Sequence, residues 1–279
     1  MLKSYIFIPA NNVKFITNVT KLNADYYVFD LEESVSENEI EISISNLSDI
    51  VLEKNYYIRF PFDYENLNYN FMFLKKIVNQ GFSKYVLPKI ETLKDFTKVI
   101  SLFNEIGLEN VKYILLIENP LILLHLQSIL AKYAFMIKSL MIGSHDYCNL
   151  VESKHDNYNL YYLRQVVITN AKAYNLEVID TAMVNIKDKD NYQNECIKAF
   201  QMGFDGKVVL HPNQLVYLNT AKYYSESEID DAIKVHKYLE GRFPEENIVV
   251  KIDNRIYEKV HMKRIFNIIR WNDIKSRKV

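Results

Sequence analysis

Short, uninterrupted apolar segments recur along this chain at a regular interval, and this repeat limits the folds that it can adopt. Each segment ends at a polar or turn-forming residue, and these end points lie about 29 residues apart on average, the length of one strand-plus-helix unit. Runs without polar alternation are typical of parallel strands buried on both faces. We therefore predict eight strands, at Tyr5–Ile8, Tyr26–Phe29, Tyr56–Arg59, Tyr85–Leu87, Tyr113–Ile117, Leu140–Ile142, Val178–Ile179 and Val208–Leu210.

Amphipathic segments separate these runs. Glu91–Glu105 places apolar residues at helical spacing and is followed by Gly107, a helix stop signal, and Tyr161–Tyr174 has a similar pattern. Eight alternating strand and helix units predict an α/β protein, a (β/α)8 TIM barrel. A doubly wound sheet is the less favoured alternative, because no glycine-rich phosphate loop follows the first strand.

The chain continues beyond the eighth strand. Ser225–Glu240 is predicted to be one more helix, and Ile248–Asp253 and Tyr257–Trp271 complete a C-terminal extension. We expect a catalytic barrel domain over residues 1–224 and a helical extension over residues 225–279.

Composition excludes several classes of protein. Lys plus Arg total 34 against 35 Asp plus Glu, a net charge of −1, so nothing favours a nucleic-acid or anionic-membrane partner. Cys148 and Cys196 are too few for a disulfide framework and indicate a reducing compartment. The start of the chain does not resemble a signal peptide, and the most apolar stretch, Tyr113–Leu124, is interrupted by Glu118. We expect a soluble, cytoplasmic protein.

Ionisable side chains follow most of the predicted strands. Catalytic groups of such barrels lie at the carboxyl ends of the strands, and converging charges cost desolvation energy unless they neutralise one another or bind a ligand. We therefore predict an active site at this end of the barrel. Its candidate segments are Pro9-Ala10-Asn11, Asp30-Leu31-Glu32-Glu33, Arg59, Pro88-Lys89-Ile90-Glu91, Glu118, Gly143-Ser144-His145-Asp146, Asp180 and His211-Pro212.

Three of these residues indicate a chemistry. Glu118 and Asp146 are hard oxygen ligands on neighbouring strands, and Mg²⁺ is commonly held by one or two carboxylates plus water and substrate oxygens. Mn²⁺ is an alternative ion at such a site. The guanidinium of Arg59 suits a bidentate grip on a substrate carboxylate. A 2-oxo or 2-hydroxy acid, polarised by the metal as a Lewis acid, is the natural substrate class.

Other interpretations of these charged residues remain open. Arg59 and Asp30 would also make a buried ion pair that closes the barrel mouth, and Asp180 and Lys207 are expected to do so at later strands. Lys89 is either a Schiff-base lysine or, as we favour, an ion-pair partner of Glu91 or Asp30. We expect Glu32 to cap the following helix or to face solvent, and His211-Pro212 to start a helix.

A set of motifs spread over nearly the whole chain resembles the HpcH/HpaI aldolase family, specifically its citrate lyase β-subunit-like branch, which includes malyl-CoA and citramalyl-CoA lyases. The motifs around Asp30 and His211 are the most specific when found together. The matching segments are Ile6–Pro9, Ala24–Val35, Ile58–Phe60, Leu87–Glu91, Ile117-Glu118, Gly143–Asp146 and Gly203–Gln214.

The resemblance implies a barrel that forms a homotrimer or homohexamer and is a Mg²⁺-dependent carbon–carbon lyase. Its relatives cleave 3-hydroxy-3-carboxylic acyl thioesters into an oxo-acid and an acyl fragment. By the same resemblance, Glu118 and Asp146 are the metal ligands and Arg59 binds the oxo-acid, with Lys89 and Asn11 as further substrate-binding candidates.

The resemblance also suggests groups that transfer the proton. Glu33 stands where the family usually has Asp, and the pair Asp30 and Glu33 is one candidate. Val249–Asp253 resembles the family's C-terminal lid, whose Asp reaches the site of a neighbouring subunit, so Asp253 is a candidate acid or base in trans.

The thioester part of the family pattern is altered. The family usually has Gly-Asn-Arg-Pro and then a Lys at positions associated with the phosphates of CoA, where this chain has Ala10–Val13 and Asn18. The family's Glu-Thr-x-x-Gly is Glu118–Ile122 here and lacks the Gly. Two alternatives therefore stay open, a lyase for a substrate that is not a CoA thioester and a catalytically silent paralogue that acts as a binding subunit.

Overall fold

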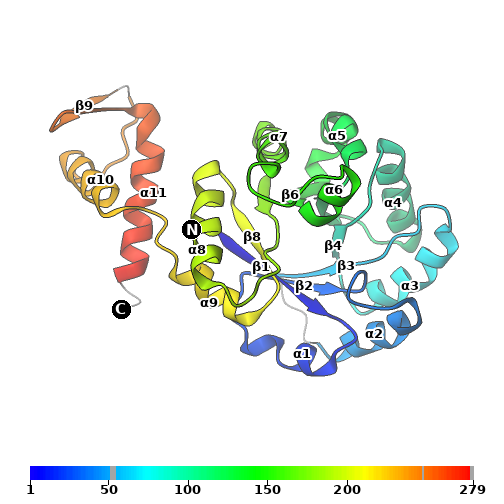
Figure 1. Cartoon of the computed structure of the whole chain (residues 1–279). Helices are drawn as coiled ribbons and strands as arrows, with labels where there is room; N and C mark the ends of the chain where they lie inside the picture. Colours follow the sequence, from blue (N-terminus) through cyan, green and yellow to red (C-terminus); the bar gives the residue numbers. More distant parts are fainter. Residues whose placement is uncertain (51–54, 247, 277–279) are drawn as a thin grey trace. The chain divides into compact units, whose positions relative to one another are not determined.

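The chain forms two compact units, which are described separately. The computed structural model describes residues 1–50, 55–246 and 248–276 (Figure 1). The larger unit comprises Leu2–Ala221, and the smaller contains Met1 and the residues from Lys222 onward. Within the described residues, no helix has the length and apolar character that crossing a membrane requires.

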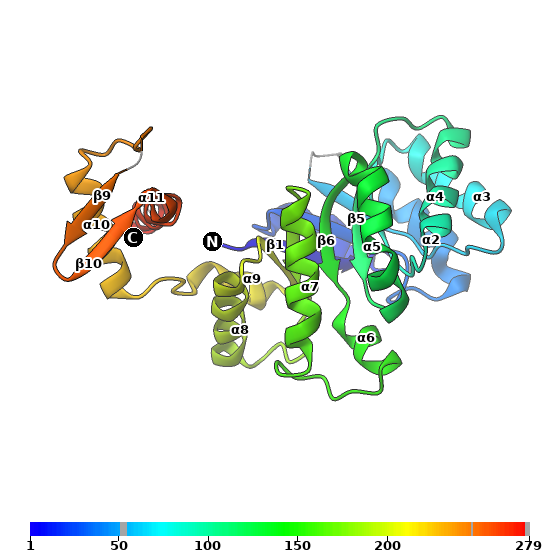
Figure 2. The same ribbon diagram turned by 90° about the horizontal axis from the view of Figure 1, so that it is seen from above.

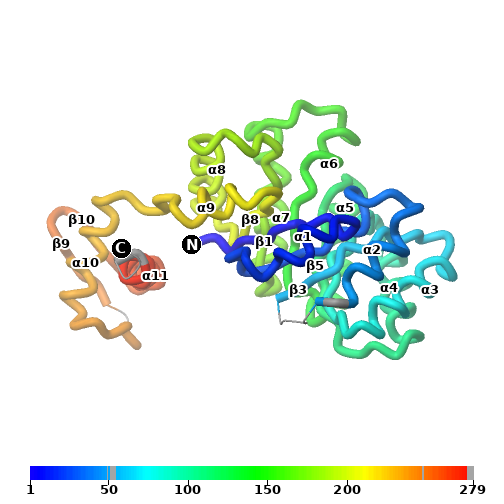
Figure 3. Tube along the Cα trace, turned by 90° about the horizontal axis from the view of Figure 1, so that it is seen from below, coloured from blue at the N-terminus to red at the C-terminus, as the bar shows by residue number. Residues whose placement is uncertain are grey.

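The larger unit is a closed barrel of eight parallel strands in sequence order, with β8 pairing back onto β1. Figure 3 shows these two strands side by side, blue against yellow. The predicted (β/α)8 barrel is confirmed, and each predicted run overlaps a strand. The strands are β1 (Lys3–Pro9), β2 (Tyr26–Asp30), β3 (Tyr56–Arg59), β4 (Lys84–Leu87), β5 (Lys112–Ile117), β6 (Ile137–Ile142), β7 (Glu177–Asp180) and β8 (Gly206–Val209).

The strand ends differ from the prediction by up to three residues. The last strand stops at Val209 rather than Leu210, because the Leu210 N–H donates to the side-chain oxygen of Gln214 at 2.8 Å instead of continuing the ladder. His211 caps the next helix through its Nδ1, which accepts from the Asn213 N–H, and Pro212 is the first helical residue. The structural role expected for this pair is confirmed.

Helices cover the outside of the strands, as Figures 1 and 2 show. Local chemistry defines their ends: Thr92 and Asp95 form a capping box, and Gly107 ends the same helix at φ 85°. The helices are α1 (Val13–Thr17), α2 (Ile40–Asn46), α3 (Leu67–Asn79), α4 (Leu93–Ile106), α5 (Pro120–Tyr133), α6 (Ser144–Leu150), α7 (Leu160–Ala173), α8 (Lys189–Met202) and α9 (Pro212–Thr220), and the 3-10 turns are η1 (Val19–Lys21), η2 (Glu37–Glu39), η3 (Leu47–Asp49) and η4 (Ala134–Met136).

Side chains from the strands fill the interior of the barrel. Tyr5, Val28, Tyr57, Ile114 and Met141 are almost fully buried in one apolar cluster, as is usual for a barrel whose centre is a packed core rather than a channel. Ligands therefore have access only at the ends, and the polar residues that follow the strands lie at one of them.

The smaller unit combines helices with a strand pair. Its elements are α10 (Glu226–Tyr238), β9 (Val249–Ile252), β10 (Arg255–Glu258) and α11 (Lys259–Ser276). The extension was expected to be helical, and it also contains an antiparallel hairpin, in which β9 and β10 pair with Ile252 opposite Arg255. Asp253 stands at the turn with φ 50°, a left-handed conformation that Asp tolerates better than most residues.

Candidate active site

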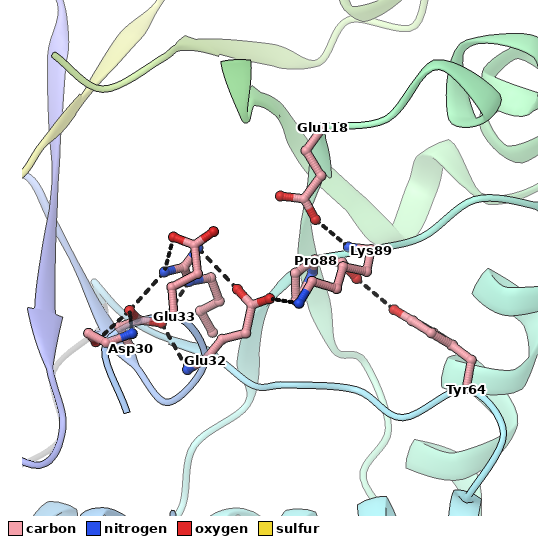
Figure 4. Close-up of polar contacts among 9 residues, drawn as sticks. Asp30, Glu32, Glu33, Tyr64, Pro88, Lys89 and Glu118 are labelled. Atoms are coloured by element: carbon pink, nitrogen blue, oxygen red, sulfur yellow. Dashed lines mark hydrogen bonds and ion pairs between the residues drawn. The ribbon is translucent and has the colours of Figure 1, made fainter. Parts of the chain in front are cut away.

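Charged side chains from five neighbouring parts of the barrel meet at the carboxyl end of the strands, and Figure 4 labels several of them. We call this group the rim cluster. It contains five carboxylates and two cations, so its formal charge is negative unless protons or a metal ion compensate. Its members are Asp30, Glu32, Glu33, Arg59, Lys89, Glu118 and Asp146.

Arg59 and Asp30 form the fixed centre of the cluster. They are the last residues of adjacent strands and face each other in register, which places Nε and Nη2 of Arg59 at 2.6 and 2.7 Å from the two carboxylate oxygens. Both residues are buried. Burial alone would raise the pKa of Asp30, but the hydrogen bonds and charge of Arg59 outweigh it and hold that pKa below its ordinary value. The expected buried ion pair is confirmed.

Glu32 bridges the two cations of the cluster. Its oxygens lie 3.1 Å from Nη1 of Arg59 and 2.8 Å from Nζ of Lys89, and the residue is only 8% exposed. The expectation that Glu32 caps a helix or faces solvent was therefore wrong. The partners suggested for Lys89 were wrong too, although its ion-pair role is correct.

Lys89 does not have the environment of a Schiff-base lysine. Its hydrogen bond to Glu32 raises the pKa of the ammonium above its ordinary value, and the side chain is 61% exposed. A Schiff-base lysine needs a lowered pKa so that the neutral amine is available. The structure thus gives no support to that alternative.

Glu118 is the most perturbed carboxyl of the cluster. It directly follows β5, is 3% exposed, and accepts one short hydrogen bond, from the backbone N–H of Lys89. Burial, together with the nearby charges of Glu32 and Asp146, raises the pKa of Glu118 to about 8. In the absence of a metal ion, its environment favours the protonated form.

Gly143 permits the close approach of β6 to Glu118. A Cβ atom at Gly143 would lie 2.6 Å from Cβ of Glu118 and 3.0 Å from Oε2, distances that side chains do not tolerate. The missing side chain therefore makes room for the carboxyl group. Gly143 also continues the strand pairing, because its N–H donates to the carbonyl of Ile117 at 2.9 Å.

A small cavity of about 100 Å³ lies beside these groups. Glu33, Arg59, Glu118 and Asp146 line it on the polar side, and Phe7 is among its apolar residues. Burial raises the pKa of Glu33, and the adjacent carboxylates of Glu32 and Asp146 raise it further against the attraction of Arg59. The cavity is therefore surrounded by carboxylates that repel one another.

The donor set of this cavity fits a hard divalent cation. Among the residues that the structure describes, no three His, Cys, Asp or Glu side chains form a ready-made metal cage. Mg²⁺ does not need one, since one or two carboxylates plus water and substrate oxygens satisfy its coordination. Glu118 and Asp146 supply two such carboxylates, and a divalent charge would offset the burial and the repulsion that together raise the pKa of Glu118.

A polar network that the sequence did not reveal lies next to Asp146. The hydroxyl of Ser144 is 2.7 Å from Nε2 of His155 and 2.5 Å from Oγ1 of Thr181. The rings of His145 and His155 stack in parallel with centroids 4.0 Å apart. These contacts fix the start of α6, the helix that carries Asp146.

Two predicted site residues are not part of the rim cluster. The side-chain amide of Asn11 donates to the Ser34 carbonyl and to Glu39, both at 3.3 Å, so it ties two loops together. Asp253 belongs to the smaller unit, where it is exposed and pairs with Lys234 at 2.8 Å. Their substrate-binding and proton-transfer roles stay predictions.

The loop after β1 uses its asparagines for local structure. The side chain of Asn12 accepts hydrogen bonds from the N–H groups of Lys14 and Phe15 and so caps α1. Asn18 donates its side-chain amide to the Lys14 carbonyl at 2.7 Å. These positions, where the family pattern has basic residues, thus hold neutral side chains bound to the backbone of α1.

A second charged group lies in the wall of the barrel, between β7, β8 and helices α7 and α8. We call it the buried network. Asp180 binds Nε and Nη2 of Arg164 at 2.9 and 3.2 Å and Nζ of Lys207 at 2.7 Å. Lys207 also reaches Glu195 at 3.3 Å. The structural role expected for Asp180 and Lys207 is confirmed.

Comparisons with known proteins agree with this architecture. The β subunit of citrate lyase from Leuconostoc mesenteroides is 24% identical over 276 residues, with 92% of this chain and 88% of the relative covered. Mouse mitochondrial citramalyl-CoA lyase is 27% identical over 270 residues, covering 85% and 78%. The crystal structure of CitE from Mycobacterium tuberculosis in complex with magnesium, acetoacetate and coenzyme A has a TM-score of 0.79, with 19% identity, and covers 96% of this chain and 97% of that protein.

A model of the family described as HpcH/HpaI aldolase/citrate lyase matches residues 3–212, which span the whole barrel from β1 to the start of α9. The chain therefore belongs to the HpcH/HpaI aldolase/citrate lyase family.

Proposed function

We propose that this protein cleaves a carbon–carbon bond of a 3-hydroxy acid or acyl thioester at the rim cluster, with Glu118 and Asp146 holding the metal ion. The reaction class follows from the family and its relatives: the protein is a Mg²⁺-dependent carbon–carbon lyase of the aldolase type. The observation that carries the assignment of residues is the shared cavity, which Glu118, Asp146 and Arg59 line together.

The metal site would provide the electrophile of the reaction. Mg²⁺ bound there would polarise a substrate oxygen and stabilise the negative charge that develops as the bond breaks. Glu118 would bind it through the oxygen that the Lys89 N–H does not hold. Asp146 approaches from the first turn of α6, where Ser144 and its partners fix the backbone.

Arg59 would orient the carboxylate of the oxo-acid. Two of its nitrogens are committed to Asp30, while its contact with Glu33 is long, at 3.3 Å, and the Glu33 side chain is 54% exposed. A substrate carboxylate can therefore replace Glu33 at Nη2 without disturbing the buried pair. Asp30 then keeps the guanidinium in place as the substrate binds.

Glu33 is the stronger proton-transfer candidate of the pair Asp30 and Glu33. Asp30 accepts hydrogen bonds from Arg59, Ser34 and the Glu32 N–H, and its pKa is lowered, so it is a weak base. Glu33 lines the cavity, and its raised pKa makes it a stronger base than an ordinary Glu carboxylate. Asp253 from a neighbouring subunit of a homotrimer or homohexamer remains the alternative.

The acyl part of the substrate is carried either by CoA or by another group. Relatives are named for CoA esters, and the CitE structure contains coenzyme A. In this chain Asn12 and Asn18 bind the backbone of α1 where the family has cations, and this favours a free acid or a carrier-bound acyl group over a CoA thioester.

Calorimetric titration tests the proposed site. Mn²⁺ and oxaloacetate should each bind more tightly in the presence of the other, because the acid would complete the coordination of the ion and neutralise Arg59. Glu118→Gln and Asp146→Asn should remove this mutual enhancement. Independent binding of the two ligands, or wild-type enhancement in both variants, would refute the assignment and favour a binding subunit without catalysis.

A thermal-shift measurement tests the acyl carrier. CoA present at 100 times its dissociation constant would stabilise the protein by about 2.7 kcal/mol. We expect no shift with millimolar CoA in the presence of Mg²⁺. A clear upward shift would assign a CoA thioester as substrate and leave the metal site unaffected.

A further inference from the structure

One peptide group at the rim of the barrel is held at both of its ends. The hydroxyl of Tyr64 donates to the carbonyl oxygen of Pro88 at 2.7 Å, and the N–H of the same peptide, which belongs to Lys89, donates to Oε1 of Glu118 (Figure 4). Tyr64 and Glu118 come from the segments that follow β3 and β5. The peptide that follows β4 therefore connects them.

The backbone conformation of Lys89 makes this connection possible. Its φ is 55°, a left-handed value that costs energy for any residue other than glycine and is typically kept where the surroundings enforce it. The side chain is anchored as well, through the 2.8 Å contact between Nζ and Glu32. The strained residue thus directs its N–H at Glu118 while its ammonium binds a different carboxylate.

Tyr64 is itself firmly placed. Its carbonyl accepts a hydrogen bond from Nζ of Lys98 on α4 at 2.7 Å. Its ring stacks on Phe62, with centroids 6.0 Å apart and an interplanar angle of 21°. The hydroxyl therefore arrives at the Pro88 carbonyl from a side chain with little freedom to move.

We propose that Tyr64 is a positioning residue for Glu118, acting through the Pro88–Lys89 peptide. This inference rests on the proposed role of Glu118 as a metal ligand. A hydrogen bond to the carbonyl polarises the peptide and strengthens the hydrogen bond that its N–H donates. Oε1 of Glu118 is thereby fixed, and Oε2 is oriented for the ion.

The variant Tyr64→Phe tests the proposal because it removes only the hydroxyl and keeps the ring on Phe62. Loss of partners that orient a metal ligand typically weakens metal binding about 10- to 100-fold. Since Tyr64 acts through one intervening peptide, we expect a loss of about tenfold in Mn²⁺ affinity by calorimetry. Tyr85→Phe is the matched control, because the Tyr85 hydroxyl also donates to a backbone carbonyl, that of Phe82 at 3.1 Å, but has no link to Glu118. Its Mn²⁺ affinity should stay within about twofold of the wild type.

A second variant separates the peptide from the lysine side chain. Lys89→Gly retains the N–H and accepts a left-handed φ without strain, but it removes the ion pair with Glu32. We expect Mn²⁺ affinity no lower than that of the wild type, because the variant keeps the N–H and removes a cation that lies near Glu118 and Asp146. A loss as large as that in Tyr64→Phe would show that the ammonium, and not the peptide, positions the carboxylate, and would overturn the proposal.

The metal-free protein supplies an independent readout. In chelator-treated wild type, the Lys89 amide should resonate downfield and exchange slowly with solvent, as expected for a short hydrogen bond to the buried carboxyl group of Glu118. Tyr64→Phe should shift that resonance upfield and speed the exchange, whereas Tyr85→Phe should not. A Lys89 amide that exchanges freely in the wild type would overturn the proposal even if Tyr64→Phe does not fold.

Glu118→Gln distinguishes a failure of this inference from a failure of the proposed function. Wild-type Mn²⁺ affinity in Glu118→Gln would refute the metal site itself. A large loss in Glu118→Gln, combined with identical behaviour of Tyr64→Phe and Tyr85→Phe, would leave the proposed function intact and refute only the role of Tyr64.

Discussion

The rim cluster and the buried network each contain an aspartate that ends a strand, Asp30 and Asp180, yet the two groups differ in their charge balance. In the buried network the two cations of Arg164 and Lys207 balance the two anions of Asp180 and Glu195, and both Asp180 and Lys207 are fully buried. Burial alone would raise the pKa of Asp180, but its two cationic partners keep it below the ordinary value. The charges of the buried network therefore neutralise one another.

The rim cluster has more carboxylates than cations and borders a cavity. Its central acid, Glu118, has its pKa raised to about 8 by burial and by neighbouring carboxylates. A charged strand end becomes a candidate site when its neighbours leave the charge uncompensated beside a cavity. Balanced pairs with no cavity are structural.

The largest expected effect is on catalysis at the rim cluster. Glu118→Gln or Asp146→Asn should lower Mg²⁺-dependent turnover by about 10³-fold or more, because metal stabilisation of developing charge is worth several kcal/mol. Both variants should keep the circular dichroism spectrum and cooperative melting of the wild type. Substantial turnover in either variant, or full activity of EDTA-treated wild type, would contradict the account.

The buried network should respond in stability instead. Asp180→Asn leaves Arg164 and Lys207 without their shared anion in a dry environment and should cost about 3–5 kcal/mol of unfolding free energy. Saturating Mg²⁺ should not restore the lost unfolding free energy of Asp180→Asn. Lys76→Gln, which breaks the exposed pair with Glu41, should leave the melting temperature nearly unchanged. Equal melting temperatures for the two variants would remove the distinction between the clusters.

The pH dependence of stability should reveal the uncompensated charge of Glu118. A folded-state pKa of about 8, against an ordinary value of 4.5, means that this group contributes most stability below pH 4.5. That contribution is lost as pH rises through 8, by an amount on the order of a few kcal/mol. In chelator, Glu118→Gln should therefore be more stable than wild type at pH 9, with the difference vanishing at pH 4.

Chemical denaturation with and without metal measures this effect. At pH 9, Mn²⁺ should restore the unfolding free energy of the wild type. It should have little effect on that of Glu118→Gln, because metal binding requires the ionised carboxylate. If the difference in unfolding free energy between wild type and Glu118→Gln stays the same from pH 4 to pH 9, the negative charge of Glu118 is already neutralised by its surroundings.

The smallest expected effect comes from the glycine behind Glu118. Gly143→Ala places a Cβ too close to the Glu118 side chain and should weaken Mn²⁺ binding about tenfold by displacing the carboxylate. Gly107→Ala is the control: its φ of 85° makes the substitution unfavourable for folding, but nothing lies within 4 Å. It should lose stability and keep metal affinity. The reverse pattern would show that the close approach at Gly143 is unimportant.

The fold was predictable because its signal is repeated. Each strand is a short apolar run, and eight runs at one interval allow few architectures, so small errors at individual ends do not matter. The hairpin of the smaller unit was missed because it has no such repetition: β9 and β10 are four residues each and are joined by a turn at Asp253.

The site was predictable as a set of strand ends but not as a set of contacts. Asp30 and Arg59 end adjacent strands, and their pairing follows from the register. The bridging position of Glu32 depends on the path of the loop after β2, which no local pattern specifies. Tyr64 reaches Pro88 across 24 positions of sequence, and a single tyrosine in a loop carries no signal of such a partner.

The position of the ion is the most direct test of the central claim. Crystals soaked in Mn²⁺ would give an anomalous-scattering peak that locates it without any assumption about the substrate. The account predicts one strong peak in the cavity, within about 2.0–2.4 Å of carboxylate oxygens of both Glu118 and Asp146. A peak at other residues, or no peak at saturating Mn²⁺ with these two side chains ordered, would contradict it.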